Sequence, residues 1–166
     1  MLSEQDRKEL GEIIDHGETS RAACVDALNW VQRKYGWVSD EHVDELARLL
    51  AMSSEELDSV ATFYNLVFRR KVGRHVILVC DSISCWIVGS EDVFARLKAA
   101  LGIDPGQTSQ DDEFTLLPVP CLGACHRAPA MMVDDDLHVN LTGEKIAQIL
   151  DQYRGRPRQG GPGAGP

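Results

Sequence analysis

The sequence has no long hydrophobic run and has fewer basic than acidic residues. No apolar segment approaches the roughly 18 residues of a membrane-spanning helix, and the opening residues, MLSEQDRKEL, are polar and carry no signal-peptide core. Lys and Arg number 17 against 26 Asp and Glu, a net charge of −9, whereas nucleic-acid-binding proteins rely on an excess of basic residues. We therefore expect an intracellular, cytoplasmic chain that neither inserts into a membrane nor binds nucleic acid.

Several sequence motifs typical of enzymes that bind nucleotides or hydrolyse substrates are also absent. The chain contains no G-x-x-x-x-G-K-[ST] phosphate loop, no strand followed by G-x-G-x-x-G, and no G-x-S-x-G nucleophile elbow. No catalytic residue and no substrate site of its own is predicted. These absences favour a protein that carries electrons over one that transforms a substrate.

The spacing of apolar residues changes near residue 75 and divides the chain. Before this point the spacing predicts four amphipathic helices, which open at Ser3, near Ser20, at Ser39 and at a capping box formed by Ser53 and Glu56. We expect these helices to form a small bundle over residues 1–70.

The fourth of these helices is expected to carry Tyr64 and Phe68 on its apolar face and to place Phe63 and Tyr64 in the core. A basic connector follows over residues 69–74, with the sequence RRKVGR. It is interpreted either as a solvated linker or as a contact surface for an acidic partner.

From His75 onward, strands alternate with helices. Strands are predicted over residues 75–80, 113–119, 130–133 and 137–141, and helices over residues 90–101 and 142–153. Ser90 is expected to cap the first of these helices, and Asp134 to Asp136 to form a solvated hairpin turn. The order β-α-β-β-β-α predicts an α/β domain over residues 71–153. The Gly- and Pro-rich tail, residues 154–166, is expected to be disordered.

The cysteines are the most informative residues of this second half. Cys80 and Cys85 come just after the first predicted strand, and Cys121 and Cys125 come just after the second. The two pairs converge if these strands are neighbours in the sheet. Four converging thiolates repel one another unless they share a cation, so the site is expected to hold a soft metal or an iron–sulfur cluster.

Spacing alone leaves three interpretations of the four cysteines open. An iron–sulfur cluster is one, a structural zinc ion in an interaction module is the second, and unligated or redox-active thiols are the third. The C-x3-C pair fits zinc knuckles less well, and the lack of any C-x-x-C weakens a thioredoxin-type dithiol. His126 is expected to be a solvated loop residue, because a Rieske centre needs two histidines.

Residues around the two pairs support a cluster. Gly89 and Gly123 permit close approach of backbone N–H groups to sulfur, and Ser82 and Ser84 offer hydroxyl donors, all of which tune reduction potentials. Trp86 is interpreted either as a shield against water or as a packing residue.

The fifth cysteine, Cys24, lies on the apolar face of a predicted helix. It is expected to be a buried structural thiol without a ligand role.

The motifs together resemble the thioredoxin-like [2Fe-2S] ferredoxins. The resemblance lies in C-D-S-x-x-C-x-x-x-G at residues 80–89, C-L-G-A-C at 121–125 and A-P-x-M at 128–131. More narrowly, G-W-V at 36–38, V-A-T-F-Y at 60–64 and V-G-R-H at 72–75 resemble the E-subunit family of bacterial NADH:quinone oxidoreductase. Ser39 stands where that family often has proline.

This resemblance implies a thioredoxin-like fold behind a helical bundle and one [2Fe-2S] cluster. Cys80 and Cys85 would hold one iron, and Cys121 and Cys125 the other. The implied partner is a flavoprotein subunit that binds FMN and NADH and exchanges single electrons with the cluster. Other peripheral-arm subunits, on the cytoplasmic face of the inner membrane, would complete a proton-translocating oxidoreductase. NAD-linked hydrogenases and formate dehydrogenases contain related chains.

The net negative charge concentrates in the half that contains the two cysteine pairs. Residues 76–153 hold 12 acidic and 4 basic residues, a net charge of −8. Negative charge disfavours adding an electron, so a reduction potential as low as that of plant-type clusters, near about −400 mV, is expected.

Overall fold

A computed structural model of the chain describes residues 1–157, and residues 158–166 lie outside the described part. The chain divides into an N-terminal unit, Met1–Lys71, and a C-terminal unit that begins at Val72. Most of the tail expected to be disordered therefore falls outside the described residues.

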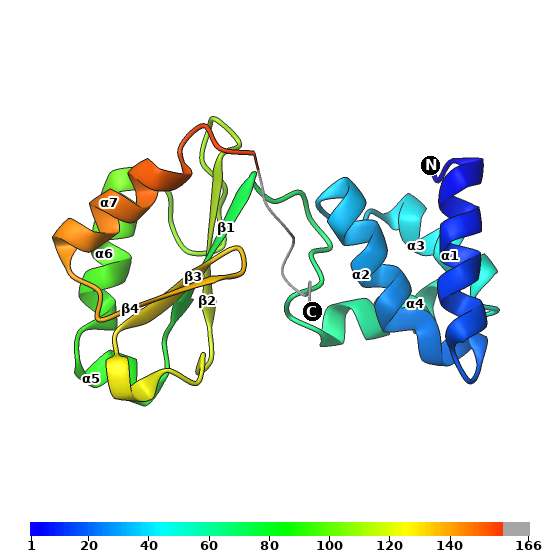
Figure 1. The fold of residues 1–166 in the computed structure, drawn as a ribbon, viewed down its shortest axis with the longest axis horizontal. Helices are drawn as coiled ribbons and strands as arrows, with labels where there is room; N and C mark the ends of the chain where they lie inside the picture. Colours follow the sequence, from blue (N-terminus) through cyan, green and yellow to red (C-terminus); the bar gives the residue numbers. More distant parts are fainter. Residues whose placement is uncertain (158–166) are drawn as a thin grey trace. The chain divides into compact units, whose positions relative to one another are not determined.

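The N-terminal unit is helical, as its apolar spacing predicted (Figure 1). Its elements are α1 (Glu4–His16), the 3-10 turn η1 (Ser20–Ala23), α2 (Cys24–Tyr35), α3 (Asp40–Leu49) and α4 (Ser54–Phe63). Capping boxes at Ser3, Ser39 and Ser53 open three of the helices, because each serine hydroxyl accepts the backbone N–H that lies three residues later. The helix expected near Ser20 begins there as a 3-10 turn and becomes α-helical at Cys24.

The apolar faces of these helices meet in one core. Its fully buried side chains include Leu10, Leu28, Val31, Leu46, Leu50 and Leu57. The amide of Gln32 is buried in the same unit, where its Nε2 donates to the Leu66 carbonyl at 2.7 Å and its Oε1 accepts from the Phe68 N–H at 2.6 Å. The Gln32 side chain thus pairs with two backbone groups, the Leu66 carbonyl and the Phe68 N–H, that would form hydrogen bonds within the helix if α4 continued.

The prediction that Phe63 and Tyr64 lie in the core is wrong. α4 ends at Phe63, Tyr64 leaves the helical conformation, and their side chains are 80% and 45% exposed. Phe68 is buried but lies outside the helix. The physical reason is the tertiary bond from Gln32, which fixes residues 66–68 in a non-helical path.

The first residue of the basic connector is not a solvated linker residue. Arg69 forms ion pairs with Asp40 and Asp58, each at 2.7 Å, and donates to the Val38 carbonyl. Arg69 therefore links the last residues of the N-terminal unit to α3 and α4 of the same unit.

At the start of the C-terminal unit, the backbone of Gly73 lies against that of Phe114. A Cβ atom added to Gly73 would meet backbone atoms of Phe114 at 2.9 Å.

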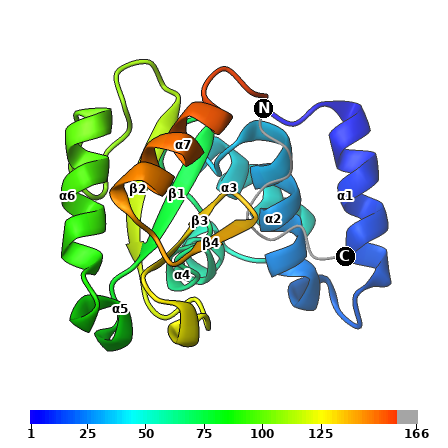
Figure 2. The same cartoon turned by 60° about the vertical axis from the view of Figure 1, so that its left-hand side comes forward.

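The C-terminal unit is a four-stranded mixed sheet with helices (Figure 2). Its elements are β1 (His75–Cys80), α5 (Ile83–Ile87), α6 (Ser90–Leu101), β2 (Phe114–Val119), the 3-10 turn η2 (Cys125–Arg127), β3 (Ala130–Val133), β4 (Asp136–Val139) and α7 (Gly143–Tyr153). The strand order is β2-β1-β3-β4, with β1 parallel to β2 and antiparallel to β3. The predicted order of the strands is confirmed, and both predicted helices are present, with the additional helix α5 between β1 and α6.

Helices α6 and α7 pack together on one face of this sheet. Val93 and Leu97 from α6 meet Ile146 and Leu150 from α7 over Ile77 and Val79 of the central strand. All six residues of β1 are buried, as expected for a central strand.

Two local features of the unit differ from prediction. The short helix α5 has no periodic signal in five residues, and it was not expected. Ser90 does not cap α6, because Gly89 holds the cap position at a φ of +103° and Ser90 lies buried inside the helix. Only glycine adopts that backbone conformation without strain, which is why the α5–α6 turn falls there.

Within residues 1–157, no helix is both long enough and apolar enough to cross a lipid bilayer.

Candidate metal centre

The parallel pairing of β1 and β2 brings the two cysteine segments to one edge of the sheet. Cys80, the last residue of β1, lies opposite Val119, the last residue of β2, and the Asp81 N–H extends the ladder to the Val119 carbonyl at 3.0 Å. Cys121 follows two residues later. The expectation that these strands are neighbours is confirmed.

The first pair is buried. Cys80 and Cys85 are each 1% exposed, and they pack with Ala124 and Ala130. Burial raises the pKa of the Cys85 thiol to about 11, and the hydrogen bond with Cys80 adds to this shift, whereas the Ala130 N–H opposes it. A charged thiolate here needs compensation from a cation, because water does not reach it.

The second pair is exposed, and its members lie against each other. The Sγ atoms of Cys121 and Cys125 are 3.2 Å apart, and the Gly123 N–H points at the Cys121 sulfur at 3.3 Å. The hydrogen bond from Cys125, followed by that from Gly123, lowers the pKa of Cys121. Donating to Cys121 raises the pKa of Cys125, which a hydrogen bond from Ser84 partly offsets.

The loop that carries the second pair is tied to the sheet. η2 begins at Cys125, and the Asn140 N–H donates to the Arg127 carbonyl at 2.8 Å. A further bond joins the Leu141 N–H to the Pro129 carbonyl at 3.3 Å. The exposed cysteines thus stand on a short loop that is fixed at its far end by β4 and the residues after it.

The residues expected to support the site divide into two groups. Gly123 and Ser84 donate to sulfur, as predicted. Gly89 does not, because its N–H donates to the Trp86 carbonyl at 3.1 Å, and the Ser82 side chain makes no capping bond to α5. Trp86 is 54% exposed and its indole N–H donates to Glu91 at 3.2 Å, so it is not a core residue.

The donor set fits a two-iron cluster better than a single ion. It consists of four thiols, and His126 of η2 is exposed. Structural zinc needs four ligands around one point, whereas a [2Fe-2S] cluster takes two thiolates on each iron. Two separate pairs match the second requirement.

Cys24 has no part in this arrangement. It belongs to α2 of the N-terminal unit, where it is half-buried and packs against that unit's core. This placement agrees with a structural thiol.

Comparison with known proteins decides the family. The model of the family "thioredoxin-like [2Fe-2S] ferredoxin" matches residues 10–154. The chain belongs to this family. The E subunit of NADH-quinone oxidoreductase from Pseudomonas aeruginosa is 44% identical over 153 residues, which cover 92% of each chain. The protein of the same name from Escherichia coli (strain K12) gives the same values. As a member of the family, the chain carries one [2Fe-2S] cluster.

The fold is shared with one chain of an NAD+-reducing [NiFe]-hydrogenase in its H2-reduced state. The TM-score is 0.73 at 21% identity, and the match covers 84% of this chain but only 23% of the hydrogenase chain. At this identity the likeness concerns the fold alone. It confirms the α/β fold class that the sequence predicted.

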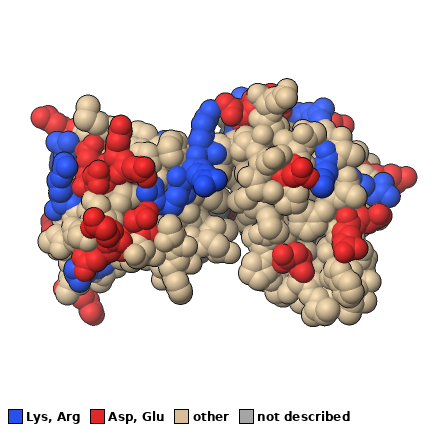
Figure 3. Space-filling model, turned by 180° about the vertical axis from the view of Figure 1, so that it is seen from behind, with Lys and Arg blue, Asp and Glu red and all other residues tan. Residues whose placement is uncertain are grey.

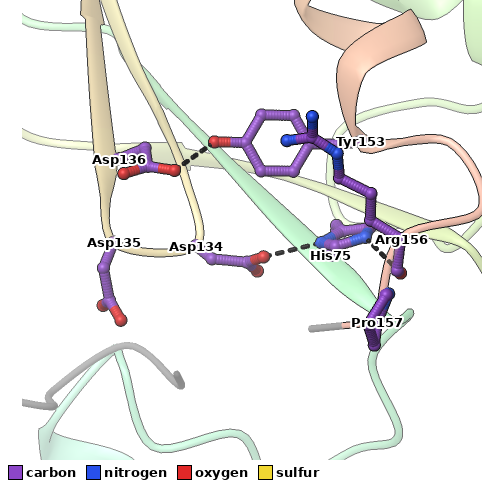
Figure 4. A pocket seen from close by; sticks show the side chains of 7 residues that line it. All are labelled: His75, Asp134, Asp135, Asp136, Tyr153, Arg156 and Pro157. Atoms are coloured by element: carbon purple, nitrogen blue, oxygen red, sulfur yellow. Dashed lines mark hydrogen bonds and ion pairs between the residues drawn. The ribbon is translucent and has the colours of Figure 1, made fainter. Parts of the chain in front are cut away.

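A separate polar cavity of about 120 Å³ lies at the opposite end of β1 (Figure 4). Its lining includes His75, the first residue of β1, and all three residues of the acidic turn. The His75 Nδ1 meets the Asp134 carboxylate at 2.6 Å, and its Nε2 meets the Arg156 carbonyl at 3.1 Å. Tyr153 donates to Asp136, which together with burial raises the pKa of the tyrosine.

The prediction that Asp134 to Asp136 form a solvated turn is wrong for its first residue. Asp134 is not a solvated turn residue, because it is 4% exposed and also accepts the Val76 N–H at 3.0 Å. Asp135 and Asp136 are exposed, as expected. The sequence carried no signal for the pairing, since His75 and Asp134 are 59 residues apart.

Proposed function

We propose that this chain is the electron-transfer E subunit of an NADH-quinone oxidoreductase. The observation that carries the proposal is the meeting of four cysteines, in two pairs, at one edge of a thioredoxin-like sheet. Similarity to proteins named as E subunits of that enzyme, at 44% identity over nearly the whole chain, supports this assignment over related NAD-linked assemblies.

In this proposal each pair of cysteines holds one iron. Cys80 and Cys85 bind the iron on the buried side, and Cys121 and Cys125 bind the iron on the exposed side. The bound cluster supplies one-electron redox chemistry. The residues of the chain exclude water from the first pair and direct N–H and O–H donors, from Gly123 and Ser84, at sulfurs of the second. Such donors stabilise negative charge on sulfur and raise the reduction potential.

The proposed partner is a flavoprotein subunit that binds FMN and NADH. Residues 76–153, with a net charge of −8 and no nucleotide-binding motif, supply neither cofactor site, so both are assigned to the partner. The host is proposed to be a proton-translocating complex with further peripheral-arm subunits, located on the cytoplasmic face of the inner membrane.

Anaerobic purification with metal and sulfide analysis tests the cofactor assignment. We expect a coloured protein with two iron atoms and two acid-labile sulfides per chain. A colourless chain with one zinc ion and no sulfide would support a zinc-stabilised interaction module instead. Dithiol oxidoreductase activity that survives a chelator would support a free-standing thiol enzyme.

Copurification tests the host assembly. A tagged chain is expected to bring with it a flavoprotein and the peripheral-arm subunits of a quinone reductase. Recovery of hydrogenase or formate dehydrogenase subunits in their place would assign the chain to one of those NAD-linked enzymes.

A further inference from the structure

The exposed cysteine pair consists of two thiols that are already in contact. The Sγ atoms of Cys121 and Cys125 are 3.2 Å apart, and both residues are exposed. A disulfide has about 2.05 Å between its sulfur atoms, so closing the bond requires a shift of only about 1 Å. Cys121 follows β2 and Cys125 opens η2, so both residues lie outside the strands and the bond can close without moving the sheet.

The buried pair offers the same atoms without access to solvent. Cys80 and Cys85 also hydrogen-bond each other, but each is 1% exposed and packs with Ala124 and Ala130. An oxidant dissolved in water reacts with a cysteine according to the accessibility of its sulfur. The two pairs therefore differ in the access of an oxidant, not in the contact between their thiols.

The surface of the C-terminal unit favours a small, uncharged oxidant. Residues 76–153 carry a net charge of −8, which repels anions. Figure 3 shows a broad uncharged surface at the lower end of the C-terminal unit, the end at which Figure 1 draws α5. Hydrogen peroxide is small and uncharged, and it oxidises thiols by two electrons.

We propose that Cys121 and Cys125 form a reversible disulfide in the chain before its cluster is inserted, and that this bond blocks insertion until it is reduced. The block rests on the proposed function. One sulfur attacks a peroxide oxygen, so that an S–O bond forms, the O–O bond breaks and water leaves. The other sulfur then attacks the first, so that the S–S bond forms, the S–O bond breaks and a second water leaves. The two thiols lose two electrons and two protons, and the peroxide takes up both.

The disulfide withholds two proposed iron ligands and also protects them. A sulfenic acid without a neighbouring thiol oxidises further to sulfinic acid, which thiols do not reduce. The second sulfur of the pair, 3.2 Å away, captures the sulfenic acid first. A dithiol returns both cysteines to the reduced state and is itself oxidised to a disulfide. The bond is therefore a reversible block on the binding of one iron.

Tryptic mass spectrometry separates the cysteines into three peptides. Cleavage after Lys and Arg places Cys121 and Cys125 in residues 99–127, Cys80 and Cys85 in residues 75–96, and Cys24 in residues 22–33. The full chain, freed of its cluster anaerobically by a chelator, is treated with hydrogen peroxide and then alkylated with iodoacetamide. Peptide 99–127 is expected to lose about 2 Da, and to escape alkylation, at least about tenfold faster than peptide 75–96. Equal rates, or a peptide 99–127 that is still alkylated twice, would overturn the proposal.

A pair of variants tests the role of the second sulfur. Cys125→Ser removes it, so Cys121 is expected to gain about 32 Da as a sulfinic acid that dithiothreitol does not reverse. The control Cys85→Ser changes the buried pair and is expected to leave the rate of disulfide closure within about twofold. Circular dichroism verifies that both variants are folded. If Cys121 in Cys125→Ser returns to a free thiol with dithiothreitol, the protective role is wrong.

The block is measured as the initial rate at which cluster absorbance appears after ferrous iron and sulfide are added. Peroxide treatment is expected to lower this rate at least about tenfold, and dithiothreitol to restore it. If the oxidised chain loads as fast as the reduced chain, the block is wrong and the proposed function stands. If the reduced chain loads no cluster, the proposed function fails and the block fails with it, whereas the masses of peptide 99–127 still decide the disulfide.

Discussion

The buried ionisable side chains at the two ends of strand β1 have different kinds of partner. At its start, His75 meets the Asp134 carboxylate, so the chain supplies both members of the pair. At its end, Cys80 meets Cys85, and both are groups that become negative on ionisation. One six-residue strand thus joins a site whose carboxylate is hydrogen-bonded by the chain itself to a site whose thiolates need a bound cation.

This difference explains why only the cysteine end is proposed as the redox centre. A buried carboxylate is tolerated when hydrogen bonds satisfy it, and Asp134 has the His75 ring and the Val76 N–H as partners. The cysteine end offers donors but no positive side chain, and burial raises the pKa of Cys85. Under the proposed ligation, these cysteines would hold a cluster whose iron atoms would supply the missing positive charge.

Removing one cysteine should have the largest effect. Cys80→Ala and Cys125→Ala are each expected to lower the bound iron and sulfide by roughly tenfold or more, because each iron would lose one of two protein ligands. Absorbance and labile sulfide per chain measure this loss. Cys24→Ala is the matched control and should retain the cluster; a colourless Cys24→Ala protein would overturn the assignment of the fifth cysteine.

Neutralising Asp134, at the other end of β1, should lower the free energy of unfolding but leave the cluster bound. Asp134→Asn keeps a residue that tolerates the positive φ of this turn, 53°, and removes the charge. The free energy of unfolding should fall by about 1.5–3 kcal/mol, the usual contribution of a hydrogen bond to a charged group. Urea denaturation measures it, with exposed Asp151→Ala as control. Cluster loss in Asp134→Asn would show that the two ends are not independent.

The two cysteine pairs should differ in reactivity once the cluster is removed. A pKa of Cys85 raised from 9.0 to about 11 leaves about one hundredfold less thiolate at neutral pH, whereas the pKa of Cys121 is lowered. Timed alkylation with iodoacetamide, read by mass spectrometry, should therefore label Cys121 well before Cys85. Equal rates would contradict the burial of the first pair.

The raised pKa of Cys85 also has a consequence for stability in the cluster-free chain. The folded state holds the thiol proton more tightly than the unfolded state, so this contribution is present below pH 9 and is lost as the pH rises towards about 11. Unfolding midpoints measured across this range should decline with pH. The cluster-loaded chain, whose thiolates are bound to iron, should not show this decline.

A glycine in the exposed loop should give the smallest effect. Gly123→Ala places a side chain at a φ of +79° and is expected to cost about 1 kcal/mol, with the cluster retained. Gly11→Ala, in the interior of α1 with no atom within 4 Å of the new Cβ, should instead stabilise the chain by about 0.5–1 kcal/mol. Opposite shifts in thermal midpoint would confirm that the Gly123 backbone conformation is required.

Sequence patterns predicted those parts of the fold that depend on neighbouring residues. Serine caps marked the starts of three helices, and the apolar run from His75 to Cys80 marked the central strand. The position of the cysteines after two strands predicted their approach, because parallel neighbours end at the same edge.

The errors arise where distant residues decide the local structure. Gln32 binds the Leu66 carbonyl, 34 residues away, which holds the chain after α4 in a non-helical path and leaves Phe63 exposed. His75 draws Asp134 into the interior. Helix α5 is five residues long, too short for a periodic signal, and its one buried residue, Cys85, packs against Cys80 from another element.

Electron paramagnetic resonance of the anaerobically purified, dithionite-reduced chain tests the central claim most directly. If the two cysteine pairs share one [2Fe-2S] cluster, the reduced protein should show a signal that integrates to about one unpaired electron per chain. A chain that stays silent under these conditions and contains a stoichiometric zinc ion would contradict the account.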